Sequence, residues 1–286
     1  MTATITPAST AAAGSAARIG ASERHSRTRL LPKSVWWIVS ACLAVLFLYP
    51  IWVMVSHVSF DDIVRLSDAS RGLSIVQSIG NSVFVSVTAT AVALVASTLA
   101  GYAFAKLPFR GSKAAFFVIL VTFMVPFQAV ITPLYIVLRD IGLQNNLIGV
   151  ALVLATFNLP LGTFLMRNSF AAIPSSLEEA AQIDGASAFS AMWRVMLPVA
   201  VPGLVSTTLL SFFAAWNDFF AALILITDQK LYTLPVSIGI LSTDSQFGVN
   251  FGLMQTGVTV TVIPCVVIYL VLQRYYVAGL LGGALK

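Results

Sequence analysis

Charged residues are scarce in this chain. Of its 286 residues only 9% are Asp, Glu, Lys or Arg, whereas 58% are hydrophobic. An average soluble domain carries about 25% charged residues, and a soluble fold of this size needs more charges than this to cover its surface. The composition therefore excludes a secreted enzyme, a nucleic-acid-binding protein and a disordered protein, and it favours an integral membrane protein.

Histidine and cysteine, common metal ligands, are also scarce, and the motif of a phosphate-binding loop is missing. The two histidines, His25 and His57, are far apart, and Cys42 and Cys265 both lie in apolar segments without metal-ligand spacing. The sequence contains no GxxxxGK[ST] loop and no HExxH pair. We therefore expect the chain to bind no metal or cofactor and to hydrolyse no ATP, so energy for its work must come from a partner or a gradient.

Long apolar runs make up most of the sequence. Five runs without charge and a sixth, 195–227, that only Asp218 interrupts, are each longer than the about 20 apolar residues of a membrane-spanning helix. The sequence therefore predicts an all-α integral membrane protein with one membrane domain, 34–276. The six transmembrane helices are expected at about 35–56, 80–105, 114–138, 147–167, 199–225 and 254–273.

Basic residues are distributed unevenly between the two predicted sides of the membrane. With the N-terminus in the cytoplasm, only Arg65, Arg71, Arg139 and Lys230 of the 16 Lys and Arg residues lie outside. Loops on the cytoplasmic side carry the excess of Lys and Arg, so the orientation N-in/C-in is predicted. Residues 1–33 are expected to form a disordered basic cytoplasmic tail, and residues 277–286 a cytoplasmic C-terminal tail.

A polar segment, 168–198, separates the fourth and fifth predicted spans on the cytoplasmic side. Ser175 and Ser176 each precede a glutamate by three residues, which is the spacing of a capping box. Gly185 is the residue type that ends helices in a left-handed conformation, and Pro198 precedes the next span. The pattern predicts two short helices joined by a glycine turn, a hairpin suited to docking on a soluble partner. The two helices are expected at 177–184 and 186–196.

This segment also carries a motif. Glu179-Ala180-Ala181, then Gly185, then Leu197-Pro198 resemble the EAA signature of permease subunits of ATP-binding-cassette (ABC) importers. Val195 departs from the isoleucine of that signature. Two further segments, 215–219 (AWNDF) and 273–286, are similar to sugar permeases and to the smaller six-span permease of maltose-type importers. The resemblance covers about residues 35–286.

The resemblance implies a carbohydrate-importer permease in the bacterial cytoplasmic membrane that works by alternating access. The implied partners are a second permease subunit, two ABC ATPase subunits, an extracytoplasmic solute-binding protein and membrane lipid, with no nucleic acid. ATP and Mg belong to the ATPase subunits, so this chain is a transport subunit and not an enzyme. The segment 168–198 is then the EAA loop, a coupling-helix hairpin that contacts the ATPase.

Three groups of residues are expected to serve these functions. The resemblance assigns ATPase coupling to Glu178, Glu179, Ala180, Ala181, Asp184, Gly185, Leu197 and Pro198. It assigns contact between the C-terminal tail and the ATPase to Gly283, Ala284 and Lys286. A substrate path or outer gate is expected at Trp216, Asn217, Asp218 and Asn158, because an aromatic ring can face a sugar ring while amide and carboxylate groups bond its hydroxyls.

Other classes remain as alternatives. The chain is an ABC importer permease for a non-sugar solute if its binding protein recognises something else. A gradient-driven transporter requires ionisable residues in the membrane, and here only Asp218, near one end of a span, is available. A membrane enzyme of the phospholipid-synthase type is suggested by Asp184-Gly185, but the further aspartates of that motif are missing.

Overall fold

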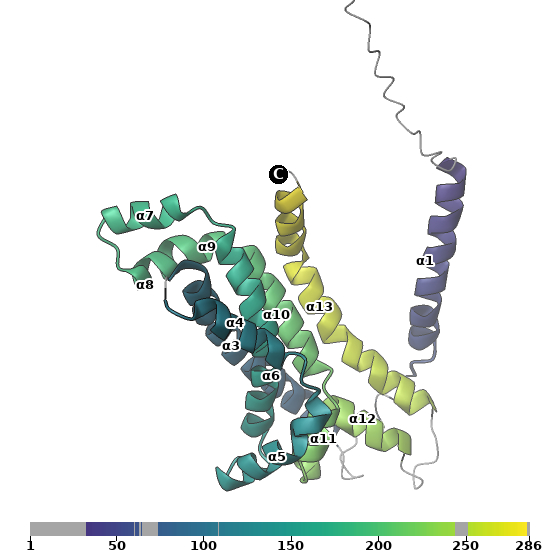
Figure 1. Cartoon of the computed structure of the whole chain (residues 1–286). Coiled ribbons are helices and arrows are strands. Elements are labelled where there is room, and N and C mark those ends of the chain that lie inside the picture. The colour runs from purple at the N-terminus through teal and green to yellow at the C-terminus, as the bar shows by residue number, and fades with distance from the viewer. Residues whose placement is uncertain are drawn as a thin grey trace, which may run out of the picture. The chain divides into compact units, whose positions relative to one another are not determined.

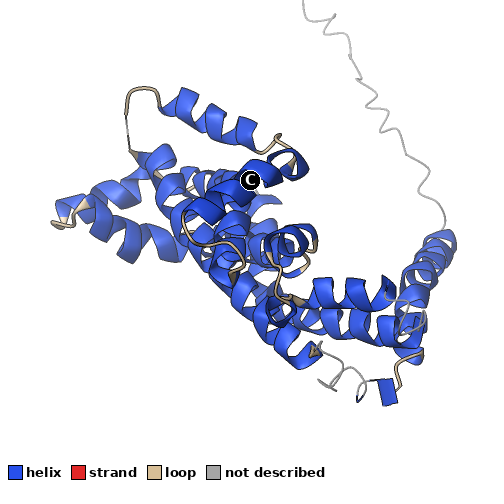
Figure 2. Cartoon of the chain, turned by 90° about the horizontal axis from the view of Figure 1, so that it is seen from below, coloured by secondary structure: helices blue, strands red, loops and turns tan. Residues whose placement is uncertain are grey.

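The computed structural model describes residues 33–59, 61–62, 64, 74–107, 109–243 and 251–284. Within these ranges the backbone forms helices joined by turns and contains no strand (Figure 2), in agreement with the all-α prediction. The predicted N-terminal tail lies outside the described residues except for Lys33, and Lys286 lies outside them as well.

Four helices are long and apolar enough to contain a membrane span: α1 (Lys33–Ser56), α3 (Ile75–Lys106), α6 (Leu147–Ala171) and α13 (Phe251–Ala284). Two more spans are obtained if each of two bent helix pairs counts as one. These pairs are α4 (Ser112–Thr122) with α5 (Phe127–Asp140), bent by 97°, and Ala188–Val199 with α10 (Val201–Trp216), bent by 80°. The described chain thus has four to six candidate spans, and six is the upper count.

The chain divides into two compact units, Met1–Ile51 and Trp52–Lys286. The first contains most of α1, which is apolar along its length and has Pro50 near its end. The second contains every other described helix and the apolar core. The elements that form the candidate site all belong to this second unit.

The packing of α3 against α6, with α10 alongside both, forms the centre of the second unit (Figure 1). Small residues permit this close approach. A Cβ on Gly101 would lie 2.5 Å from the Cβ of Met166 and 2.8 Å from the backbone nitrogen of Arg167. Since no side chain tolerates such distances, glycine is required where the two helices meet.

Two predicted spans are interrupted. The span predicted at 114–138 breaks where Pro126, with ψ of 128°, is the N-cap of α5. Proline lacks the N–H that would continue the preceding helix and disfavours helical conformation in the residue before it. The span predicted at 199–225 ends at Trp216, and the short helix α11 (Phe220–Leu225) follows Asn217-Asp218-Phe219.

The C-terminal part of the chain follows a different course from the prediction. After α11 come the 3-10 turn η3 (Gln229–Leu231) and α12 (Leu234–Thr243), which packs on α3 and α13. Helix α13 continues to Ala284, past its predicted end at residue 273. The segment predicted as a tail is therefore helical up to Ala284.

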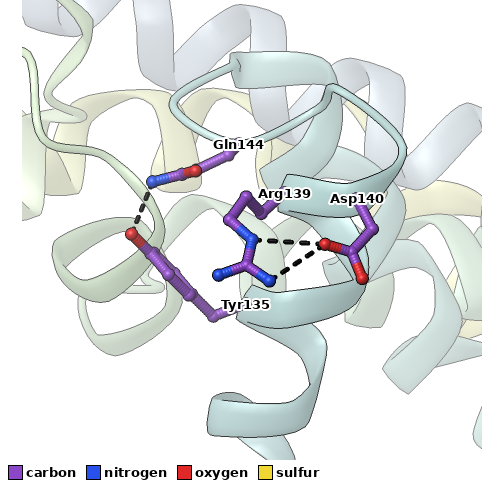
Figure 3. A network of polar contacts seen from close by, with 4 residues as sticks. All are labelled: Tyr135, Arg139, Asp140 and Gln144. Carbon is purple, nitrogen blue, oxygen red and sulfur yellow. Dashed lines mark hydrogen bonds and ion pairs between the residues drawn. The ribbon is translucent and has the colours of Figure 1, made fainter.

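A polar network marks the end of α5 (Figure 3). Arg139 donates from Nε and Nη2 to Oδ1 of Asp140 over 3.2 and 3.1 Å, and Gln144 donates to the hydroxyl of Tyr135. The side chains of the ion pair are 57% and 60% exposed, so the pair contributes at most about 1 kcal/mol. The network therefore places polar groups at the surface where the apolar helix ends.

Candidate coupling hairpin and substrate path

A helical hairpin connects the end of α6 to the start of α10. It consists of α7 (Ser175–Ile183), α8 (Ala188–Ala191), the π-helix η2 (Met192–Met196) and α9 (Leu197–Val199). Figure 1 shows α7, α8 and α9 together at the end of the second unit where α6 ends and α10 begins. We call residues 174–199 the hairpin.

Gly185 forms the predicted turn of the hairpin. Its φ is +85°, a left-handed conformation that glycine adopts without strain. A Cβ at this position would meet nothing within 4 Å, so the requirement for glycine comes from the backbone conformation and not from crowding. Beyond the turn, Ser187 caps α8 by accepting a hydrogen bond from the N–H of Ser190 over 3.3 Å.

The predicted capping box is wrong. Pro174 is the N-cap of α7, and no side chain caps this helix. Ser175 and Ser176 already lie inside the helix, because the chain enters helical conformation directly after the proline, whose φ of −56° suits a helix start. Each serine is thus displaced from the position in which its hydroxyl would accept from the third amide of the helix.

One side of α7 is fixed to α3. Glu178 is only 8% exposed, and its Oε1 accepts a hydrogen bond of 2.6 Å from the hydroxyl of Tyr102. The same hydroxyl lies 3.3 Å from the carbonyl oxygen of Ala188, on the second arm of the hairpin. A hydrogen bond to a carboxylate is stronger than one between neutral groups. Tyr102 therefore holds both arms of the hairpin to the membrane domain.

Further contacts strengthen this attachment. Lys106, in the last turn of α3, donates from Nζ to the carbonyl oxygen of Ile173 over 2.6 Å, just before α7. The ring of Tyr102 packs edge-on against Phe170 with 5.5 Å between ring centroids. An apolar cluster fills the space beneath the hairpin and joins α3, α6 and η2. Its buried members are Tyr102, Met166, Phe170, Ile173, Met192, Met196 and Ala200.

The other side of α7 is exposed. Glu178 and Ala181 face the membrane domain, and we call them the inner side. Exposed residues of the same helix and its end form the outer side: Glu179, Ala180, Ile183 and Asp184. The isoleucine is 86% exposed, which is unusual for so apolar a side chain. A charged and apolar surface of this kind is typical of a contact with another protein.

Sequence reasoning missed four residues of this region. Tyr102 and Ile183 are described above, and Phe189 and Trp193 on the second arm are 64% and 46% exposed and pack edge-on against each other. Helical spacing offered one signal, because Ile183 lies four residues after Glu179 and therefore on the same face. No local pattern pointed to Tyr102, which is 76 residues from Glu178.

The end of the EAA motif differs from the prediction. Leu197 is half-buried against the apolar cluster beneath the hairpin, whereas Pro198 is exposed within α9. The chain bends at Ala200, and not at Pro198, before α10 begins. Of the residues predicted to contact the ATPase from the C-terminal tail, Gly283 and Ala284 are the last two residues of α13.

Trp216, Asn217 and Asp218 lie where α10 ends. Trp216 is 1% exposed, stacks on Phe212 at 5.8 Å, and donates from Nε1 to the carbonyl oxygen of Thr261 over 3.0 Å. In contrast with the expectation, this buried ring offers no face to a sugar in the described conformation. Its place in the core results from packing against α13, which local sequence does not indicate.

The polar residues of the predicted path have local partners. Asn217 is exposed and donates to the carbonyl oxygen of Phe213 over 2.9 Å, and half-buried Asp218 accepts from the N–H of Ala222 over 3.1 Å. This aspartate caps the first turn of α11, where a negative charge is favourable. Asn158 is half-buried in α6 and donates to the carbonyl oxygen of Leu154 over 2.9 Å.

The chain is similar to known transport proteins. The family model described as the binding-protein-dependent transport system inner membrane component matches residues 93–281. The trehalose transport system permease protein SugB of Mycobacterium tuberculosis is 38% identical over 206 residues, which are 72% of this chain and 75% of that protein. The diacetylchitobiose uptake system permease protein DasC of Streptomyces coelicolor is 30% identical over 237 residues, 83% of this chain and 84% of that protein.

Solved structures give the same result. A chain of a bacterial ABC transporter involved in the import of the acidic polysaccharide alginate is similar with a TM-score of 0.70 and 26% identity, covering 85% of this chain and 97% of that chain. The methionine transporter MetNI, at 19% identity and a TM-score of 0.53 over 71% of this chain and 93% of that chain, shares the fold. With the family match spanning most of the sequence, the chain belongs to the family of binding-protein-dependent transport system inner membrane components and is a permease of an ABC importer.

Proposed function

We propose that this chain is one of two permease subunits of a carbohydrate importer in a bacterial cytoplasmic membrane. Three of the four similar proteins described above are named for trehalose, for diacetylchitobiose and for the polysaccharide alginate, and the fourth, which shares only the fold, is named for methionine. These substrates share hydroxyl-rich pyranose rings, and their names support a sugar, an oligosaccharide or a sugar derivative as the solute. A solute-binding protein outside the membrane delivers it, and two ATPase subunits supply the energy.

The proposed coupling element is the hairpin, and the observation that carries this assignment is the buried hydrogen bond between Tyr102 and Glu178. An ATPase subunit docks on the outer side of α7, where Glu179 offers a carboxylate to a basic residue and Ile183 fills an apolar recess. Movement of the docked subunit then displaces α7. Because Tyr102 and Lys106 attach the hairpin to α3, the displacement reaches the central helices of the membrane domain.

Alternating access follows from this connection. Closure of the ATPase dimer on ATP pushes the hairpin and opens the permease toward the loaded binding protein, and hydrolysis reverses the change. The bend of 80° between the hairpin helices and α10 gives a place where the hairpin and the membrane helix change their relative angle. ATP and Mg stay on the ATPase subunits, whereas this chain contributes the substrate path and the hairpin that couples to the ATPase.

The orientation N-in/C-in agrees with the distribution of charge around the hairpin. Lys106 lies at the end of α3 that contacts the hairpin, Arg167 lies in the last turns of α6, and Arg194 lies in the hairpin itself. Arg139, one of the four basic residues predicted to lie outside, is instead at the end of α5. Accumulation of basic residues at one end of the membrane helices supports a cytoplasmic location for that end.

The outer gate is proposed at Asn217 and Asp218, where two helices meet. The break between α10 and α11 leaves the amide of Asn217 exposed, and helix ends that line a cavity are the usual place for polar groups within a membrane domain. Trp216 supports this break from the core side through its contact with Thr261. Asn158 remains a second candidate on α6.

The coupling proposal is tested by charge reversal on the outer side. Glu179→Lys is expected to weaken capture of co-expressed ATPase subunits at least tenfold and to abolish uptake, because charge-assisted hydrogen bonds contribute about 1.5–3 kcal/mol and the reversal adds repulsion. Asp140→Lys, a charge reversal in the surface network of α5, is the matched control and should retain both. Normal uptake by Glu179→Lys would remove the hairpin from the coupling route.

The substrate proposal is tested separately. The cognate binding protein is screened by thermal shift against a panel of mono-, di- and oligosaccharides, with amino acids and peptides as the comparison set. We expect stabilisation by at least one saccharide and transport of that same compound by the assembled importer. Stabilisation by an amino acid or peptide alone would overturn the carbohydrate assignment and leave the family assignment untouched.

A further inference from the structure

A basic cavity of about 610 Å³ lies between the ends of α3 and α6 and the start of α4. It is separate from the inner side of α7 and from the Asn217–Asp218 break. The turn after α3 and the first turn of α4 supply one wall, and the last turns of α6 supply Arg167. The lining residues that matter here are Phe104, Phe109, Arg110, Ser112, Lys113 and Arg167.

The three cations of this cavity have no negative partner among the described residues. No carboxylate oxygen of the residues that the structure describes lies within 4.0 Å of Arg110, Lys113 or Arg167. The Nε of Arg167 is buried and makes no hydrogen bond within the described part of the chain. Buried N–H donors are nearly always paired in folded proteins, so Arg167 is a cation whose hydrogen-bonding capacity the described residues leave incompletely used.

Aromatic packing fixes the position of Arg167. Its guanidinium carbon lies 4.3 Å from the centroid of the Phe116 ring, and Phe104 packs against Phe116 and Phe109 at 5.5 and 5.6 Å. Stacking on a ring holds the planar guanidinium in one orientation, so its forked N–H groups lie in a fixed plane. That fork matches the geometry of a phosphate group, which it binds through two parallel hydrogen bonds.

The location selects the kind of phosphate. The cavity lies where the apolar helices α3 and α6 reach their polar ends, which is the depth of lipid headgroups in a bilayer. Next to it, Phe109 is 45% exposed, and Phe117 and Val118 on α4 are 66% and 62% exposed. Helix α4 buries none of its residues, so an acyl chain can lie along it while the headgroup enters the basic cavity.

We propose that this cavity binds the headgroup phosphate of an anionic phospholipid, with Arg110, Lys113 and Arg167 as the ligands. Basic pockets between membrane helices recognise such headgroups. The single negative charge of the bound phosphodiester offsets part of the charge of the three cations and fixes the turn between α3 and α4. The inference rests on the membrane helices and the cavity alone, and it holds whatever solute the importer carries.

The experiment uses the full-length chain purified in neutral detergent, with phosphatidylglycerol and phosphatidylcholine titrated in parallel and binding followed by native mass spectrometry. The variant is Arg110→Gln with Lys113→Gln, both at exposed positions. Arg139→Gln with Lys230→Gln removes the same charge elsewhere and is the matched control. We expect wild type and control to bind phosphatidylglycerol more tightly than phosphatidylcholine, and the variant to bind it about thirtyfold more weakly, since each such cation contributes about 1 kcal/mol.

Two results would overturn the proposal. Equal binding of phosphatidylglycerol by the variant and its matched control would show that the cavity does not hold the headgroup. Displacement of the lipid by inorganic phosphate at equal concentration would show that the site takes a free anion and not a lipid. Unfolding temperatures within one or two degrees of wild type for both double variants confirm that folding is not the cause of any difference.

Discussion

Glu178 and Glu179 are adjacent in sequence and have opposite surroundings. Glu178 is 8% exposed and accepts a hydrogen bond from Tyr102. Glu179 is exposed and has no hydrogen bond or ion pair within the described part of the chain. Consecutive residues of an α-helix point in directions about 100° apart. The inner side of α7 thus holds the hairpin to the permease, whereas its outer side is available to a partner.

Substitution of the turn residue is expected to have the largest effect, because it disturbs both sides at once. Gly185→Val places a β-branched side chain at φ of +85°, where L-residues are strained by about 1–2 kcal/mol or more. The hairpin then changes its turn, and we expect no sugar uptake and no ATPase capture, with normal membrane insertion. Gly80→Val, in ordinary helical conformation with open space around it, serves as the control in the same uptake assay.

Removal of the inner contact is expected to have an intermediate effect. Tyr102→Phe leaves the buried carboxylate of Glu178 without this donor, which costs about 1–3 kcal/mol. The variant should unfold at a lower temperature and transport more slowly, yet still capture the ATPase. Tyr135→Phe removes the hydroxyl of a half-buried tyrosine that accepts from Gln144 away from the hairpin, and it should leave the transport rate at the wild-type value. Unchanged stability of Tyr102→Phe would contradict the role given to this contact.

Truncation of the apolar part of the outer side is expected to have the smallest effect. Ile183→Ser removes an 86% exposed side chain, so the free energy of unfolding should stay within about 0.5 kcal/mol of wild type. ATPase capture should fall several-fold, because the apolar contact with the partner is lost. Gln182→Ser, at the neighbouring exposed position, is the control in the same capture assay. An equal fall in ATPase capture for Gln182→Ser would contradict a specific contact of Ile183 with the partner.

The sequence predicted the elements of the hairpin better than their roles. The EAA motif and Gly185 placed two short helices and a left-handed turn between two membrane segments, and the turn is confirmed by the φ of Gly185. Which side of α7 faces inward depends on Tyr102 of α3, a contact between distant segments. No local pattern contains that information, so the sequence assigns both Glu178 and Glu179 to ATPase coupling, with Glu179 alone in the EAA motif.

For the membrane helices, too, local sequence predicts the elements better than the surroundings of single side chains. Charge-free length indicated the apolar segments, but it did not indicate the bend of 97° at Pro126 that divides one predicted span. An aromatic residue beside Asn and Asp suggested a sugar contact at Trp216, whereas the ring is buried against α13. Composition predicts where a helix is apolar, but the environment of one side chain depends on the helix that packs against it.

The most direct test compares Glu178→Ala with Glu179→Ala in the same assembled transporter, with unfolding temperature and ATPase capture measured for each variant. The account predicts that Glu178→Ala lowers the unfolding temperature and largely keeps the ATPase, because it removes the contact of α7 with Tyr102. Glu179→Ala should keep the unfolding temperature of wild type and lose the ATPase. The same change in both measurements for the two variants, or the reverse assignment, would contradict the division of α7 into an attached side and a docking side.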